Sequence, residues 1–163
     1  MGQYLTRLWR YGLSLSRRRD LAEDLVQATC LRALERADQF AWGTRLDHWL
    51  FAILHSIWLN EMRAQHIRAG KGFSVAEPLA IDGVAETETR VLANQVIRHV
   101  YDLPEAQRAA VFLCYVEGLS YREAADVLAI PIGTVMSRLA AARLKIAGAI
   151  EPVGRPASAR SAK

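Results

Sequence analysis

Apolar residues recur at helical spacing along most of this chain. Val135, Leu139, Ala142 and Ile146 follow one another at intervals of four, three and four, which predicts a helix with one buried stripe. No segment alternates between apolar and polar residues as a half-buried strand does. We therefore expect an all-α protein. The same spacing predicts further helices over residues 3–16, 20–37, 45–68, 88–102 and 104–118.

Two predicted helices near the C-terminus meet at a short break. Ser120 and Glu123 have the spacing of a capping box, so a helix should begin at Ser120. Pro131 should end it by about residue 130, because proline lacks an N–H donor and suits the first turn of a new helix. The small side chains of Ala124 and Ala125 allow a close, steep crossing. The pattern predicts a helix-turn-helix, although ordinary helical hairpins share its local signals.

The chain divides into two small helical modules. In the first, Asp20 with Glu23 repeats the capping pattern and should begin the second helix. Residues 69–87 have mixed polarity with three glycines and one proline, which favours a flexible linker. The end of the chain is rich in Pro, Ser, Ala and Arg, and we expect disorder there. The expected parts are a first module at 1–70, a linker at 71–87, a helix-turn-helix module at 88–150 and a disordered tail at 151–163.

The charge pattern fits two modules that touch one polyanion. Residues 1–72 carry 11 basic and 7 acidic side chains, residues 73–90 carry one basic and four acidic, and residues 91–163 carry nine and six. Two basic blocks are thus separated by an acidic connector. A net charge of +4 permits a nucleic-acid partner without proving one.

The sequence contains no pattern typical of an enzyme active site or a metal-binding site. His48 and His55 could share a helix face, but no Cys or carboxylate three or four residues away completes a metal site. Cys30 and Cys114 are isolated and fit buried core thiols in a reducing compartment. No apolar run has the character of a signal peptide or a membrane span. We expect a soluble, cytoplasmic protein that is not an enzyme and needs no cofactor.

Aromatic residues near basic ones raise the possibility of single-stranded DNA binding. Trp42 lies in a predicted loop beside Arg45, and Phe51 and Trp58 fall off the main Leu/Ile stripe of the helix at 45–68. Base stacking on an exposed aromatic contributes about 1–3 kcal/mol per base. Trp49 is better explained as a packing residue. A solvated basic helix end is an equally good account of Arg63 and its basic neighbours taken alone.

The order of these motifs resembles one family. The segments DLAEDLVQATCLRAL, LDHWLFAILHSIWLNEMR and LSYREAADVLAIPIGTVMSRL, at this separation, resemble the extracytoplasmic-function (ECF) sigma factors of bacterial RNA polymerase, which keep the second and fourth sigma regions. The resemblance covers about residues 4–148. It implies a subunit that binds core RNA polymerase and promoter DNA, and that is usually held by an anti-sigma factor, often a membrane protein.

The resemblance also implies roles for particular residues. The docking surface for core polymerase would comprise Asp20, Glu23, Asp24, Leu25 and Gln27. The residues for capture of the −10 element would be Trp42, Arg45, His55, Ser56, Trp58, Asn60 and Arg63. The reader of the −35 element would comprise Thr134, Met136, Ser137, Arg138, Ala141, Arg143 and Lys145.

Departures from the family pattern leave a rival hypothesis open. Ser56 stands where many members carry an Asn that holds a flipped base, and Met136 and Ala141 stand where basic or larger residues are common. The promoter grip should therefore be weaker or differently specified. The alternative is a sigma mimic that sequesters an anti-sigma factor and never binds promoters. The acidic docking helix and Arg138 favour the sigma factor, and a stand-alone repressor would leave the first module unexplained.

Overall fold

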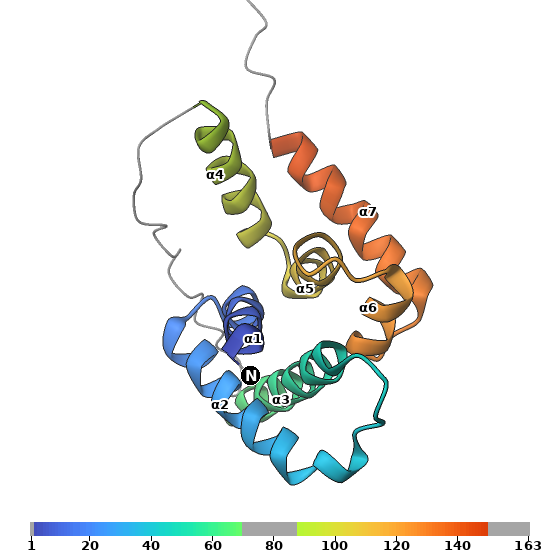
Figure 1. Ribbon diagram of the computed structural model, residues 1–163. Coiled ribbons are helices and arrows are strands. Elements are labelled where there is room, and N and C mark those ends of the chain that lie inside the picture. Colours follow the sequence, from blue (N-terminus) through green and yellow to red (C-terminus); the bar gives the residue numbers. More distant parts are fainter. Residues whose placement is uncertain (1, 70–87, 150–163) are drawn as a thin grey trace, which may run out of the picture.

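The computed structural model describes residues 2–69 and 88–149, and every regular element in these ranges is helical, which confirms the all-α prediction. The expected linker at 71–87 and tail at 151–163 lie outside the described residues. Figure 1 shows the arrangement. The first module contains α1 (Gly2–Ser16), α2 (Arg19–Glu35), the short 3-10 turn η1 (Ala37–Gln39) and α3 (Leu46–Ala69). The second contains α4 (Glu88–Tyr101), α5 (Glu105–Val111), the π-helical segment η2 (Phe112–Val116), α6 (Tyr121–Leu128) and α7 (Ile132–Ala149).

Close packing of α1 on α2 depends on a glycine. A Cβ atom at Gly12 would lie 3.4 Å from the backbone of Ala22, which is fully buried, so the two helices approach almost to backbone contact. Leu8, Tyr11 and Leu15 bury the same side of α1. This packing fixes the orientation of α2, whose opposite face remains in solvent.

The start of α2 differs from the prediction. The N-cap residue is Arg18, which makes no side-chain capping bond, and Asp20 lies inside the first helical turn. Arg18 Nε donates to Asp20 Oδ1 at 3.1 Å instead. The capping role assigned to Asp20 is therefore wrong: the carboxylate pairs with a guanidinium two residues earlier, where it still lies favourably near the positive end of the helix dipole.

The helix-turn-helix forms as its local sequence predicts. The Ser120 N–H donates to Glu123 Oε2 at 2.7 Å, and the Glu123 N–H donates to Ser120 Oγ at 3.3 Å, completing the capping box. Ala129 ends α6 in a left-handed conformation with φ of 53°, and α7 begins directly after Pro131. The two helices are bent by 106° at this break, within the range of helix-turn-helix motifs.

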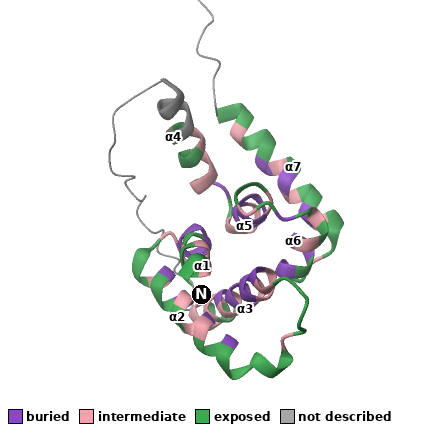
Figure 2. Cartoon of the chain, in the orientation of Figure 1, coloured by how far each residue is buried: buried purple, intermediate pink, exposed green. Residues whose placement is uncertain are grey.

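The two modules share one continuous hydrophobic core. α3 packs against α6 and α1 packs against α5, so Leu8, Phe51, Leu113 and Leu128 belong to a single buried cluster. Figure 2 shows that α1, α3, α5 and α6 each carry buried residues. Cys30 and Cys114 are free thiols. Both are half-buried rather than fully buried as expected, although Cys114 packs against the hydrophobic core. The positions of the functional surfaces are thus set by packing between modules as well as within them.

In the ranges 2–69 and 88–149, no single helix is long and apolar enough to cross a bilayer, and only the sharply bent pair α6 and α7 reaches the required length and hydropathy when taken together.

Candidate nucleic-acid interface

The outer face of α2 combines acidic and apolar side chains. Asp20, Glu23, Asp24 and Gln27 are exposed, as a docking surface requires. Leu25 is only 6% exposed and packs into the core, so its place on that surface is wrong. At 3.6 residues per turn, Leu31 and Leu34 fall in the same row as Asp24 and Gln27, and both are mostly exposed, at 60% and 65%. Leu31 and Leu34 were not predicted as part of the docking surface, although their helical spacing from Asp24 and Gln27 places them on the same face of α2.

Three aromatic rings form a series from the loop before α3 to its first turn. Trp42 is 92% exposed. The Phe40 ring lies 5.8 Å from the Trp42 ring and 5.2 Å from the Trp49 ring, measured between centroids. The Phe40 plane is inclined by 76° to the Trp42 plane and by 50° to the Trp49 plane, so the rings do not form a parallel stack. The mostly exposed Trp42 ring is the surface on which an unpaired base can stack. The expected stacking residue Trp42 is therefore available, and Trp49 is only partly buried.

The remaining −10 candidates divide between the surface and the core. Ser56, Asn60 and Arg63 are exposed along one face of α3. Trp58 is 5% exposed and His55 is 6% exposed, so the structure contradicts their assignment to a DNA-contacting surface. Phe51, which also falls off the Leu/Ile stripe, is buried as well. Phe51 and His55 contact Tyr11 of α1, and Trp58 is buried in the same core cluster. The Leu/Ile stripe alone does not reveal this covered face.

His55 occupies a closed site between the modules. Its Nδ1 lies 3.0 Å from the Tyr11 hydroxyl, and the Tyr11 ring stacks on Phe112 of the second module. Burial and the nearby positive charge of Arg138 lower the pKa of His55 to about 4. The imidazole is therefore neutral at pH 7 and serves as a hydrogen-bonded core group.

Arg45 is exposed but already paired. Its guanidinium donates to Asp47 Oδ2 at 2.8 Å and to Glu123 of α6 at 3.3 Å. Burial would raise the pKa of the Asp47 carboxyl, but hydrogen bonds from Arg45 and Arg7 outweigh this effect and lower it to about 2. This predicted −10 residue is thus bonded to Glu123 at the N-terminal end of the helix-turn-helix.

The −35 candidates occupy two flanks of α7. Thr134, Arg138, Ala141 and Lys145 fall in one row at 3.6 residues per turn, with Ser137 beside it. Met136 and Arg143 lie on the other flank, and Arg143 Nε donates to the Leu139 carbonyl at 3.4 Å. A DNA groove that contacts the whole row containing Arg138 would therefore contact the Met136 and Arg143 flank only at its edge.

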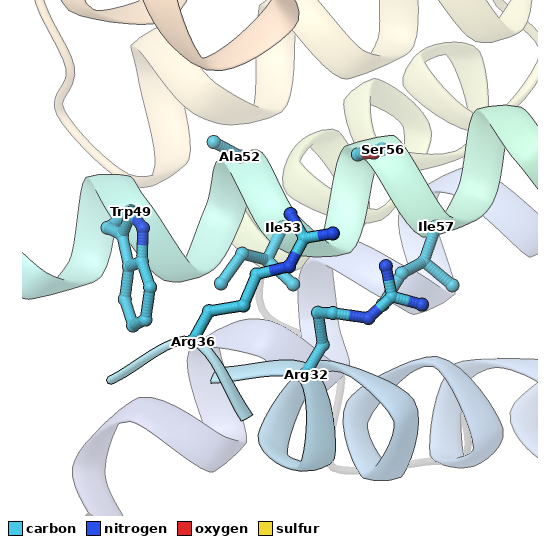
Figure 3. Close-up of a pocket in the computed structure, with 7 residues that line it drawn as sticks. All are labelled: Arg32, Arg36, Trp49, Ala52, Ile53, Ser56 and Ile57. Carbon is cyan, nitrogen blue, oxygen red and sulfur yellow. The ribbon is translucent and has the colours of Figure 1, made fainter. Parts of the chain in front are cut away.

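A pocket of about 200 Å³ lies between the C-terminal end of α2 and the open face of α3 (Figure 3). Arg32, in the last turn of α2, and Arg36, directly after the helix, extend across it, while Trp49, Ala52 and Ser56 line it from α3. Neither arginine was predicted from the sequence. Their i and i+4 spacing places them on one flank of α2, but only the packing of α2 on α3 brings them beside Ser56.

Comparison with known proteins agrees with this architecture. The family description "Sigma-70 region 2" matches residues 1–67, and "Sigma-70, region 4" matches residues 101–146. The ECF RNA polymerase sigma factor EcfG of Rhodopseudomonas palustris is 36% identical over 139 residues, which are 83% of this chain and 75% of that protein. The ECF RNA polymerase sigma factor SigC of Mycobacterium tuberculosis is 32% identical over 147 residues, 89% of this chain and 78% of that one.

A solved structure shows the same arrangement of helices. The sigma factor RpoE of Bartonella quintana, crystallised with the anti-sigma factor NepR, superposes with a TM-score of 0.73 at 32% identity, over 90% of this chain and 91% of that one. The sequence motifs, the geometry of the helix-turn-helix and the similar proteins all indicate the same family. The chain therefore belongs to the ECF class of RNA polymerase sigma factors, which direct transcription initiation at promoters.

Proposed function

We propose that this chain uses three surfaces, one that docks on core RNA polymerase and two that recognise promoter DNA. The outer face of α2, with Asp20, Glu23, Asp24 and Gln27, docks on core RNA polymerase. The loop at 40–45 and the open face of α3 hold unpaired −10 bases, and the Arg138 row of α7 reads the −35 element. The first module, residues 1–70, thus provides the docking and −10 functions, and the second, residues 88–150, provides the −35 function. The observation that carries the proposal is the aromatic series beside α3 in a chain that also contains a helix-turn-helix.

The chemistry follows from what each surface presents. Trp42 and Phe40 offer ring faces to bases that have left the duplex. Asn60 and Arg63 extend beyond them on α3, where Arg63 Nη1 donates to the Asn60 side-chain oxygen at 3.2 Å, and a guanidinium there suits phosphates. The chain positions DNA, while bond formation belongs to the polymerase, and we place this work in the cytoplasm.

The modules must separate before both promoter elements are bound. Elements named −10 and −35 are about 25 base pairs apart, or about 85 Å along B-form DNA at about 3.4 Å per base pair. A compact chain of this length has a radius of gyration of about 15 Å, so it cannot reach both elements. The 18 residues at 70–87 could span up to about 60 Å when extended. Release of α6 from α3 would also free Arg45 from Glu123 and Arg138 from the vicinity of His55.

An anti-sigma factor is the partner that this requirement favours. The related sigma factor of Bartonella quintana was crystallised with one. A protein that binds the joined modules more tightly than the separated ones would hold the chain inactive by population shift. We include such a partner in the proposal without assigning its contact residues.

Transcription in vitro tests the proposal directly. Purified core polymerase with the full chain should produce transcripts from a pooled library of randomised promoters, and these promoters should share −35 and −10 motifs. The rival sigma-mimic hypothesis predicts neither transcripts nor a stable complex with core polymerase. A stable complex that yields only random start sites would contradict the assigned DNA surfaces while preserving the docking surface.

A further inference from the structure

Arg45 is bonded to carboxylates of both modules. Its Nε and Nη2 atoms donate to the two oxygens of Asp47 at 3.2 and 2.8 Å, a bidentate pair that fixes the plane of the guanidinium. Asp47 is only 8% exposed and also accepts a hydrogen bond from Arg7 of α1 at 3.1 Å, so its carboxylate is itself held in place. The remaining terminal nitrogen, Nη1, lies on the other side of the guanidinium and donates to Glu123 of α6 at 3.3 Å.

The contact between Arg45 and Glu123 is long for a bond between charged groups. Such bonds usually measure about 2.7–2.9 Å, whereas Glu123 Oε1 lies 3.3 Å from Arg45 Nη1 and 3.7 Å from His48 Nε2. His48 Nε2 is buried and has no hydrogen-bond partner in the parts of the chain that the structure describes. The shortest bond of this carboxylate goes to the Ser120 N–H in its own module, at 2.7 Å. Arg45 and His48 thus form an anion site that Glu123 fills incompletely.

We propose that Arg45 and His48 bind one backbone phosphate of single-stranded DNA, and that Glu123 occupies this phosphate site while the modules are joined. A phosphate oxygen, like a carboxylate oxygen, is negatively charged and accepts hydrogen bonds from a guanidinium. Contacts to phosphate hold a strand in place without reading its sequence. Trp42 lies three residues before Arg45 and is 92% exposed, so its ring is available to a neighbouring base. The inference deepens the proposed −10 function and rests on it.

Asp47 acts as the positioning residue of this phosphate site. When the modules separate, Arg45 loses Glu123 but keeps its two bonds to Asp47, because both residues belong to the first module. The guanidinium then presents Nη1 to a phosphate in an orientation that is already fixed, so less side-chain entropy is lost on binding. This benefit opposes the repulsion between the Asp47 carboxylate and DNA, and we infer that it is the larger of the two effects.

The charge of Glu123 can be removed without removing the cap of α6. A capping box accepts either Glu or Gln at its fourth position, so in Glu123→Gln the amide oxygen still accepts the Ser120 N–H. The neutral amide is a weaker competitor for Arg45 than the carboxylate. Glu123→Gln therefore tests the competition for Arg45 while α6 keeps its first turn.

Binding of a fluorescein-labelled dT pentamer to the full chain, followed by anisotropy, tests the site without requiring transcription. Glu123→Gln should tighten binding about two- to fivefold, the range expected when one partly exposed competing ion pair is lost. In an Arg45→Ala background the same substitution should give no gain. Asp126→Asn, which removes an equal charge from an exposed position of α6, should leave the affinity unchanged.

Asp47→Asn separates positioning from net charge. Loss of a negative charge alone would tighten binding of a polyanion, whereas loss of the positioned guanidinium should weaken pentamer binding by at least about twofold. The slope of log affinity against log salt should also become shallower by about 0.7, because one phosphate contact is lost. Neither change should appear when Asp47→Asn is made in the Arg45→Ala background.

Each contrary outcome overturns a stated part of the proposal. A gain from Glu123→Gln that persists in Arg45→Ala would show that general opening of the junction, and not release of Arg45, exposes the DNA-binding surface. Equal gains for Glu123→Gln and Asp126→Asn would reduce the effect to net charge, and tighter binding by Asp47→Asn would remove its positioning role. An undiminished gain with a pentamer that carries neutral methylphosphonate links, or no pentamer binding by any variant, would overturn the phosphate as ligand.

The pentamer and transcription assays fail independently. Absence of transcripts together with the expected pentamer results would count against the proposed function and leave the phosphate site standing. Promoter-specific transcripts together with contrary pentamer results would overturn the phosphate site and leave the proposed function standing.

Discussion

Arg7 and Glu117, which are 110 residues apart in sequence, join the two modules by a short ion pair. Arg7 Nε donates to Glu117 Oε2 at 2.6 Å, and the Glu117 side chain is only 5% exposed. The same guanidinium donates to Asp47 Oδ2 at 3.1 Å and lies over the Phe51 ring. α1, α3 and the end of η2 therefore meet at one cation.

Glu117→Gln should loosen this junction. The amide keeps the shape but loses the charge, and we expect docking of the modules to weaken by about 1–2 kcal/mol, discounted because Arg7 is partly exposed. Small-angle scattering should then give a radius of gyration above the roughly 15 Å of the compact chain, and binding to a −35 duplex should tighten. Asp126→Asn, an equal charge change on the exposed side of α6, serves as the control. Unaltered scattering in both variants would show that the ion pair does not hold the modules together.

Arg108 makes a second connection, through backbone carbonyls. Its buried guanidinium donates to Ser14 and, at 3.1 Å, to Leu15 at the end of α1, and to Leu103 at 2.6 Å within its own module. Arg108→Met should lower the free energy of unfolding by about 3 kcal/mol, because buried carbonyls lose charged donors. Urea denaturation measures this loss, and Arg108→Lys should recover part of it. A loss below about 0.5 kcal/mol would mean that water replaces the guanidinium.

Acid should destabilise the chain through His55 before its carboxylates titrate. Its pKa is about 4 in the folded protein, against 6.5 as the ordinary value, so the unfolded chain takes up the proton first as the pH falls. Stability is full above about pH 7 and declines toward pH 4, by up to about 3 kcal/mol, with no further loss from this group below that pH. His55→Gln, which can still bond to Tyr11, should flatten this slope in denaturation at pH 7, 5.5 and 4. An identical slope in the variant would place the titration elsewhere.

Local signals in the sequence predicted the helix-turn-helix well. The capping box of Ser120 and Glu123, the break at Pro131 and the stripe through Val135 and Leu139 all depend on neighbours within a few residues. The local sequence is therefore sufficient to determine the helix boundaries in this part of the chain. The π-helical segment after Val111 was not predicted, because no turn signal interrupts that apolar run.

The sequence predicted the exposure of the candidate −10 residues less well, because α3 is covered from more than one side. α1, α2 and α6 all pack on it, so Trp58, Phe51 and His55 are buried although they lie off the Leu/Ile stripe. Helical periodicity locates one buried stripe, whereas the second covered face depends on how the modules dock. The meeting of Arg36 with Ser56 is likewise a long-range result of packing.

Asp24→Lys should abolish tight binding to core RNA polymerase while preserving the fold. Asp24 is exposed in the same row of α2 as Gln27 and Leu31, so reversing its charge alters the proposed docking face without disturbing the core. We expect at least a tenfold loss of affinity, or about 1.4 kcal/mol, in a surface-immobilised polymerase assay, with the free energy of unfolding changed by no more than about 0.5 kcal/mol.

Two further variants distinguish docking from general charge effects. Asp38→Lys makes the same reversal in η1, off the α2 row, and should reduce polymerase affinity by less than twofold. Leu31→Ser removes an apolar side chain that is 60% exposed, so it should leave stability intact and still weaken the complex if α2 docks through this row. Equal losses of polymerase affinity for Asp24→Lys and Asp38→Lys would indicate that binding depends only on net charge. That result would contradict the assignment of the α2 face as the docking surface.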